Sequence, residues 1–398
     1  MIVEAVVDQH LERCSHLWEA RCELLVDSDI TLSELTHHDR EISSHLEGLR
    51  LALQSAPGNE DADLPEEPAA LFTAVAAAVC CGARDELQRL AAGAADANTA
   101  AAVADGLAWD GGEHSDFLTI QLLSAEDPFQ LEAGLRSAVE QRLLFPATVI
   151  ENTVAAAHPR FLWGIGELGM SDLHPQCRAF LSADDVGQRF CAARSLLIMG
   201  DESARGILQE IAESDDSIGT EASQLAGRGQ TYPQVADWVQ KLTGDPARLG
   251  RAILVAGATG DPMAAWWLVD CMAVEDVCAV AGAAFSQITG VDLEHEDLTA
   301  DAEDSGDDGQ ESDLPVPDPT LVRAWWTQNE GRFQAGTRYL AGQQISHDTL
   351  WSVLAEGSQR HREAAAIELA LMDPGRPLFN VRGRGDRQLR LTQDQSVC

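Results

Sequence analysis

The sequence predicts an all-α protein organised around a helical-repeat array, and three observations carry this prediction. Glycines that follow helical stretches recur at nearly constant intervals of 31, 29, 31 and 30 residues. Helical patterns of apolar residues fill these intervals, and the chain lacks long runs of β-branched residues with the alternation typical of strands. A fixed period of this size is the sequence signature of a helical solenoid. The recurring residues are Gly169, Gly200, Gly229, Gly260 and Gly290.

Each recurring glycine is predicted to end a helix, because glycine adopts the left-handed conformation after a helix at the lowest cost. Asp201 and Asp261 directly follow two of these glycines. An aspartate at that place can accept hydrogen bonds from the free N–H groups that open the next helix. The alternative is that glycine ends the helices of an ordinary, non-repeating bundle. The regular spacing favours the repeat.

The N-terminal part predicts two long amphipathic helices, over residues 2–26 and from about residue 31 to residue 53, that pair as an antiparallel hairpin. Residues 55–68 are rich in proline and acids and predict a linker. We therefore assign residues 1–68 to an N-terminal helical hairpin with an acidic linker.

Short helices separated by small-residue turns are predicted next, and they lead into the regular repeat. Together they assign residues 69–291 to a HEAT-like α-solenoid. The helices expected before the clear repeat cover residues 69–81, 84–92, 97–107, 116–123, 129–143, 147–157 and 160–169.

The array is followed by a segment of different composition. Residues 292–313 hold 11 acids and no base, and a proline-rich stretch follows them. Such a dense block of like charge cannot pack, so we expect residues 292–319 to form a disordered, proline-bounded loop. Residues 320–398 then predict a small C-terminal helical cap, with an arginine-rich tail from Arg376 that we expect to be loosely ordered.

The charge balance constrains the partner. The chain has 65 acids and 27 bases, for a net charge of −38. Residues 1–314 hold 56 of the acids and 17 of the bases, so the excess lies before the C-terminal cap. Nucleic acid is disfavoured as a partner, because phosphate binding needs clustered lysine and arginine. A basic protein is favoured, since an acidic field steers an oppositely charged partner. The alternative is that the charge serves solubility alone.

Location and redox state are indicated by what the sequence lacks. Its apolar stretches are too short to span a bilayer, and its first residues lack the pattern of a signal peptide. We expect a cytoplasmic protein without membrane contact. The nine cysteines are scattered without a CxxC pair, which favours reduced thiols over disulfides or a zinc site.

Motifs for catalysis and cofactor binding are missing. The sequence contains no P-loop, no GxGxxG after a strand, no HExxH and no GxSxG. His37 and His38 are neighbours that point to different faces of a helix, and His10 and Cys14 supply only two metal ligands. We therefore predict no catalytic residue, no cofactor and no metal.

Two adjacent tryptophan pairs, Trp266-Trp267 and Trp325-Trp326, leave two interpretations open. Neighbours on a helix are about 100° apart, so one ring of a pair can be buried and the other exposed. An exposed tryptophan is typical of a binding anchor. The other interpretation is that both rings pack between helices.

Several phrases of the sequence resemble a bacterial family of HEAT-like (PBS-lyase-type) repeat proteins that are encoded in type VI secretion gene neighbourhoods. They include His45-Leu46-Glu47-Gly48-Leu49-Arg50, Leu314-Pro315-Val316-Pro317-Asp318-Pro319 before Trp325-Trp326, and Gln359-Arg360-His361-Arg362-Glu363-Ala364-Ala365-Ala366. The resemblance covers most of the chain and implies a HEAT-like solenoid beside secreted toxins. Its motifs are structural, so it transfers no active-site residue, and the acidic segment 292–313 is not a feature of the family.

The resemblance and the charge together predict a non-enzymatic immunity protein. It would bind and neutralise a cognate type VI secretion toxin, expected to be a basic nuclease domain, through acidic surface complementarity. The alternative is an adaptor or scaffold that loads an effector or spike without neutralising it. An enzyme related to bilin lyases is disfavoured, because shared repeats say nothing of activity.

Contacts to the partner are expected from acids in inter-helix turns and in the acidic segment after the array, because the array itself carries little of the excess charge. The oligomeric state is left open. The predicted partner-binding residues are Asp215, Asp216, Glu275, Asp276, Asp301, Glu303, Asp304, Asp307 and Asp308.

Overall fold

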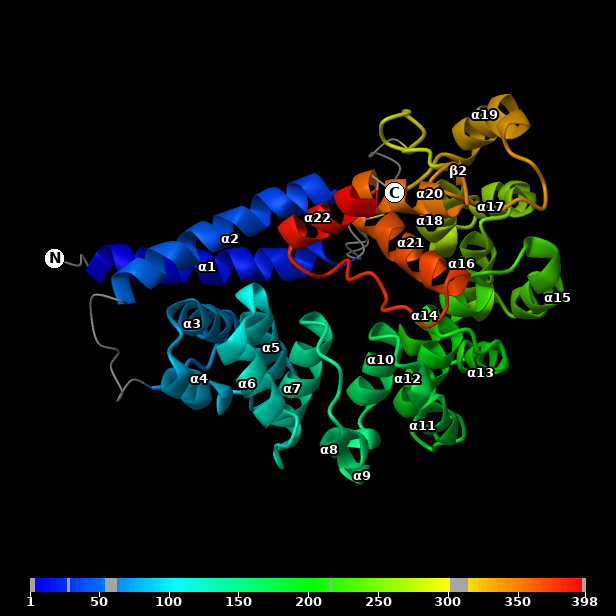
Figure 1. Ribbon diagram of the computed structural model, residues 1–398. Coiled ribbons are helices and arrows are strands. Elements are labelled where there is room, and N and C mark those ends of the chain that lie inside the picture. Colours follow the sequence, from blue (N-terminus) through cyan, green and yellow to red (C-terminus); the bar gives the residue numbers. More distant parts are fainter. Residues whose placement is uncertain (1–3, 27–28, 54–62, 215–216, 301–313, 396–398) are drawn as a thin grey trace. The chain divides into compact units, whose positions relative to one another are not determined.

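The structure of the protein is a computed structural model that describes residues 4–26, 29–53, 63–214, 217–300 and 314–395 (Figure 1). Within these ranges the chain forms α-helices α1 to α22, five short 3-10 helices and one two-stranded sheet. The predicted all-α class is confirmed. Among the described helices, none combines the length and the apolar character needed to cross a membrane.

The chain divides into two compact units, each with its own hydrophobic core. Unit 1 comprises residues 1–180 together with residues 375–398, and unit 2 comprises residues 181–374. The C-terminal residues therefore belong to the same unit as the N-terminal helices. This division does not coincide with the boundaries predicted after residues 68, 291 and 319.

The predicted N-terminal hairpin is present in unit 1. Helix α1 spans Glu4–Leu24 and α2 spans Leu32–Leu53, and Figure 1 shows the two side by side. Trp18 of α1 and Leu46 of α2 are buried in the core of this unit. The Trp18 ring stacks on Phe72, with ring centroids 5.2 Å apart, so the hairpin packs directly on the following helices.

Shorter helices complete unit 1, most with bounds close to those predicted. The predicted helix at residues 147–157 is instead two single turns, because Asn152 accepts hydrogen bonds from the N–H groups of Val154 and Ala155 and opens a second turn. The helices are α3 (Pro68–Cys81), α4 (Arg84–Ala91), α5 (Ala97–Asp110), α6 (Glu113–Leu122), α7 (Pro128–Glu140), α8 (Ala147–Ile150), α9 (Thr153–Ala156), α10 (Pro159–Glu167), α11 (His174–Ala179) and α22 (Gly385–Gln395).

The described residues of unit 2 form ten α-helices, four short 3-10 helices and a short hairpin. Helices α12, α14, α16 and α18 each contact the next in this series, and α13, α15 and α17 connect them. The elements are α12 (Val186–Ile198), α13 (Ala204–Ile211), α14 (Ser217–Gly227), α15 (Tyr232–Thr243), α16 (Leu249–Thr259), α17 (Ala265–Cys271), α18 (Cys278–Thr289), α19 (Pro319–Asn329), β1 (Tyr339–Leu340), β2 (Gln343–Gln344), α20 (His347–Glu356) and α21 (Gln359–Met372).

The recurring glycines end helices in the predicted conformation. Their φ angles are 64°, 90°, 76°, 69° and 69° in chain order, all in the left-handed region. The predicted capping by the following aspartate is present at Asp261, which opens the 3-10 helix Pro262–Ala264. It is absent at Asp201, because α13 begins after Ser203 without a side-chain cap and Asp201 bonds to the turn before it. Asp201 accepts a hydrogen bond from the N–H of Ser203, and Asp261 accepts one from the N–H of Met263.

Two of these glycines have a second role that the sequence did not indicate. The β1–β2 hairpin lies against the C-terminal ends of α16 and α18. A Cβ atom added at Gly260 would lie 2.3 Å from the carbonyl oxygen of Tyr339, and one added at Gly290 would lie 2.5 Å from that of Ala341. Glycine is therefore needed at both places for the backbones to approach each other.

The same C-terminal segment of unit 2 supplies donors to carbonyl groups that helices leave free at their ends. Arg338 donates from Nε to the carbonyl oxygen of Thr259 at 2.8 Å. The backbone N–H of Ala341 donates to the carbonyl oxygen of Gln287 at 2.8 Å. Glu368 of α21 is 1 % exposed and forms an ion pair with Arg338. Residues 338–342 thus lie against the C-terminal ends of α16 and α18.

Candidate functional site

Two of the predicted partner-binding residues lie in the described part of unit 2. Glu275 and Asp276 belong to the 3-10 helix Glu275–Val277, which joins α17 to α18, and both side chains are exposed. Both carboxylates are therefore accessible at the surface, and partner binding through them stays a prediction. The other predicted residues lie outside the described residues, namely Asp215, Asp216, Asp301, Glu303, Asp304, Asp307 and Asp308.

Burial removes more bases than acids from the surface of the described chain. Its buried charged residues are five arginines and three acids. The acidic excess therefore lies at the surface and is slightly larger there than the formal net charge indicates. The buried arginines are Arg21, Arg194, Arg205, Arg228 and Arg362, and the buried acids are Asp39, Asp261 and Glu368.

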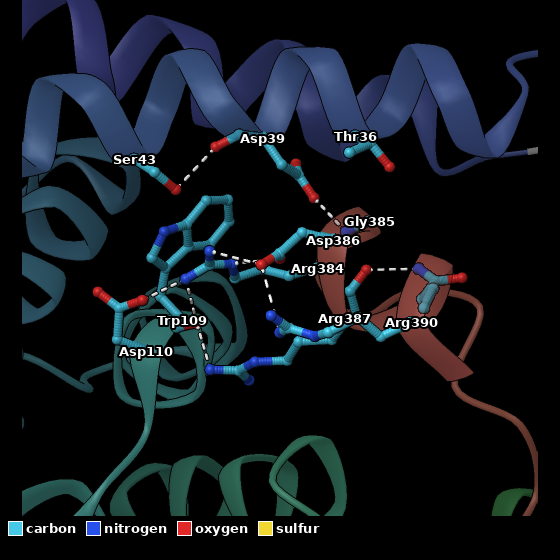
Figure 2. Close-up of polar contacts among 12 residues, drawn as sticks. Thr36, Asp39, Ser43, Trp109, Asp110, Arg384, Gly385, Asp386, Arg387 and Arg390 are labelled. Atoms are coloured by element: carbon cyan, nitrogen blue, oxygen red, sulfur yellow. Dashed lines mark hydrogen bonds and ion pairs between the residues drawn. The ribbon is translucent and has the colours of Figure 1, made fainter. Parts of the chain in front are cut away.

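Unit 1 holds a polar groove between α2 and the C-terminal helix α22, shown in part in Figure 2. Its volume is about 780 Å³. Its lining contains three arginines and three acids. The groove therefore offers hydrogen-bond partners but favours neither an anionic nor a cationic ligand. The lining residues are Thr36, Asp39, Arg40, Ser43, Ser44, Glu47, Arg384, Asp386, Leu389, Arg390 and Gln393.

One end of this groove is held by a buried ion pair. Arg21 Nε donates to Asp39 Oδ1 at 2.7 Å, and its Nη2 donates to the carbonyl oxygens of Arg382 and Gly383. Asp39 Oδ2 accepts from the N–H of Gly385, at the start of α22, at 2.8 Å. Burial acts to lower the pKa of Arg21, but the charge of Asp39 and its hydrogen bond outweigh it and the pKa is raised. The guanidinium therefore stays charged.

The arginine-rich tail that we expected to be loosely ordered is instead anchored to the end of α5. Arg384 pairs with Asp110 and donates to the carbonyl oxygen of Trp109 at 3.2 Å (Figure 2). Arg387 donates to the carbonyl oxygens of Ala108 at 2.9 Å and Trp109 at 2.8 Å. The helix C-terminus attracts these cations, because its free carbonyl groups carry partial negative charge.

The guanidinium groups of Arg21 and Arg384 both lie close to the Trp109 ring. The guanidinium carbon of Arg21 is 5.4 Å from the ring centroid and that of Arg384 is 5.5 Å away. Both distances are within the range of cation–π attraction. Arg384 is therefore held by three kinds of group, namely an indole ring, nearby carboxylates and helix-end carbonyl groups.

The histidines considered as metal ligands have other contacts. His10 Nδ1 lies 2.9 Å from His45 Nδ1 across the α1–α2 hairpin. His38 Nε2 lies 2.8 Å from the carbonyl oxygen of Leu17, while His37 is exposed. Within the described ranges, no group of three or more His, Cys, Asp or Glu side chains is arranged to hold a metal ion.

The two tryptophan pairs of unit 2 follow different interpretations. Trp266-Trp267 has one exposed ring, whereas both rings of Trp325-Trp326 pack against the core. Trp326 is buried, Trp267 and Trp325 are half-buried, and Trp266 is 38 % exposed. The adjacency of the tryptophans was the only sequence signal for this surface. It could not show which ring is exposed, because that depends on the packing of α19 against α17.

Comparisons of the chain with protein-family models, with curated proteins and with solved structures found no match.

Proposed function

We propose that the protein is a non-enzymatic binding protein whose partner is a basic protein. The observation that carries the proposal is the location of its charge. Among the described residues, five arginines but only three acids are buried, so the excess of acids lies at the surface. An acidic surface steers a basic partner towards it and excludes nucleic acid.

The scaffold of this binding protein is a HEAT-like helical-repeat array in our proposal. Two observations support it. Helices α12, α14, α16 and α18 contact one another in order, and in unit 1 helices α3, α5, α7 and α10 do the same. The five left-handed glycines mark the ends of the helices at a nearly constant interval. Stacked repeats of this kind form extended surfaces suited to protein binding.

The resemblance to repeat proteins of type VI secretion neighbourhoods supports a cognate secreted toxin as the proposed partner, with a basic nuclease domain as the expected target. The protein would then act in the cytoplasm as an immunity protein. Its carboxylates would cover the nucleic-acid groove of the toxin, where phosphates otherwise bind basic side chains. Neutralisation needs no chemical step by this chain.

The proposal is tested with the toxin encoded beside the gene for this chain. Purified toxin and this protein should co-elute, and co-expression should restore the growth of cells that produce the toxin. A protein that neither binds nor rescues would contradict the proposal. Binding and secretion of the toxin without protection of the producing cell would instead identify an adaptor.

A further inference from the structure

An exposed aromatic surface in unit 2 is flanked by carboxylates. The Trp266 ring on α17 donates from Nε1 to Glu330 at 3.1 Å. Asp270 lies one helical turn after Trp266, and Met263 precedes it on the same side with 49 % of its surface exposed. We call Met263, Trp266, Asp270 and Glu330 the Trp266 surface.

A guanidinium already occupies this surface. Arg323 of α19 places its guanidinium carbon 5.8 Å from the centroid of the Trp266 ring. Its Nη2 donates to Asp270 Oδ1 at 2.5 Å. The combination of indole face and carboxylate matches the one that Trp109 and Asp110 offer to Arg384 inside unit 1. The protein therefore uses the same chemistry for arginine twice.

The two arginine sites differ in exposure. Arg384 is 16 % exposed and also binds helix-end carbonyl groups, so it is held firmly. The side chains of Arg323 and Asp270 are 48 % and 64 % exposed. Exposed ion pairs contribute little to stability, because water solvates both charges and each side chain loses freedom on pairing. Arg323 can therefore leave the Trp266 surface at little cost.

We propose that the Trp266 surface is a recognition site for an arginine side chain of the basic protein partner, which displaces Arg323. The inference rests on the proposed function for its partner and names the surface that this partner contacts. Trp266 provides the cation–π face and Asp270 provides the acceptor that now binds Arg323. Glu330, which accepts from the indole N–H of Trp266, adds a second negative charge beside the ring. The exposed Glu275 and Asp276 follow the C-terminal end of α17, beyond Asp270, and add negative charge there.

The first test needs no partner. The capped peptide acetyl-Gly-Arg-Gly-amide is titrated into the full chain, and the indole N–H signals are followed by NMR. The Trp266 signal is assigned by its loss in Trp266→Phe. We expect the Trp266 signal to shift more than the other indole signals when the arginine peptide is added. It should stay unchanged with a control peptide in which glutamate replaces the arginine.

Variants decide whether the site works as proposed. Asp270→Asn and Glu330→Gln should each weaken peptide binding by about two- to fivefold, in keeping with attractions at exposed sites. The control Glu356→Gln removes an exposed acid on α20 and should leave binding unchanged. Arg323→Ala should strengthen binding, because it removes the internal competitor. Equal shifts of all indoles, or weaker binding by Arg323→Ala, would overturn the inference.

The second test uses the toxin partner and separates the two proposals. Trp266→Ala should weaken toxin binding, while Phe117→Ala, which removes another exposed ring beneath an arginine, should not. Thermal unfolding verifies that both variants fold. Toxin binding that is unaffected by Trp266→Ala would reject the Trp266 surface and keep the proposed function. A wild-type protein that fails to bind the toxin, yet shifts its Trp266 signal with the peptide, would reject the function and keep the arginine site.

Discussion

Asp39 accepts a hydrogen bond from Arg21 at 2.7 Å, although the two residues are only 2 % and 5 % exposed. The same carboxylate accepts from the N–H of Gly385 at the start of α22. Arg21 in turn binds the carbonyl oxygens of Arg382 and Gly383. One buried ion pair thus connects α1, α2 and the C-terminal segment within unit 1.

Removing one member of this pair should be costly. Asp39→Asn leaves the Arg21 charge buried without its counter-ion, so we expect the free energy of unfolding to fall by about 3–5 kcal/mol. Urea unfolding measures the loss, and amide hydrogen exchange should become faster in α22. The exposed Asp8→Asn is the matched control and should change stability by less than about 0.5 kcal/mol. Unchanged exchange in α22 would show that the pair does not anchor it.

The glycines under the β1–β2 hairpin provide a second prediction. Alanine at Gly260 or Gly290 must adopt the left-handed backbone conformation, which lowers the free energy of unfolding by about 1–2 kcal/mol. It also overlaps a carbonyl oxygen of the hairpin, which adds about 1–3 kcal/mol. Both variants should therefore be clearly less stable in urea unfolding.

Gly206 is the control for these variants, because it lies inside α13 in open space, without a left-handed backbone. Gly206→Ala should raise stability by about 0.5–1 kcal/mol, since glycine is unfavourable within a helix. If all three alanine variants changed stability alike, the contact between the hairpin and the helix ends would be refuted.

The glycines also show how far the sequence could predict the fold. Their spacing indicated where helices end, because helix termination is local and leaves a mark within a few residues. Their contact with residues 339–341 joins positions about 50 to 80 residues apart. No local pattern records such a contact, so the C-terminal segment was expected to cap the array rather than lie across helix ends.

The prediction that the arginine-rich tail is loosely ordered was wrong for a related reason. Residues after Arg376 lack an apolar stripe, which is the usual sign of a packed helix. Helix α22 is ordered instead by polar contacts, with Asp39 at its start and with carbonyl groups of α5 bound by Arg384 and Arg387. Those acceptors become visible only when the two ends of the chain are brought together.

The candidate site was less accessible to sequence reasoning than the fold. Charge counting selected Glu275 and Asp276, and both are exposed. It could not select Trp266, whose surroundings come from Asp270 on its own helix and from Arg323 and Glu330 of a later segment. The composition predicted the kind of partner, while the arrangement of unit 2 supplied a candidate surface.

The histidine pair of the N-terminal hairpin predicts a pH dependence. The two Nδ1 atoms of His10 and His45 share one hydrogen bond, which requires one ring to be neutral and accept. Burial, followed by the charges of His10 and Arg13, lowers the pKa of His45 below its usual 6.5, and Glu41 opposes this effect. The folded protein therefore binds protons less readily than the unfolded chain, so stability should fall as the pH drops below 6.5.

Thermal unfolding between about pH 7.5 and about pH 5.5 measures this effect. The wild type should lose more of its Tm over this range than His45→Gln, in which the titrating ring is replaced by a neutral amide. His37→Gln is the control, because His37 is exposed on the same helix. An identical pH profile for wild type and His45→Gln would remove the pair as a source of the dependence.

The acidic surface predicts that association with the basic partner depends on salt. The Debye length shrinks from about 30 Å at 0.01 M to about 8 Å at physiological ionic strength, so long-range attraction weakens over this range. The association rate constant should fall steeply, while the dissociation rate changes less. The paired variant Glu275→Gln/Asp276→Asn should flatten this dependence more than Asp348→Asn/Glu356→Gln, which removes the same charge from α20. A rate constant that is indifferent to salt would mean that the acids of this chain serve solubility, and that the partner is recognised by shape and apolar contact instead.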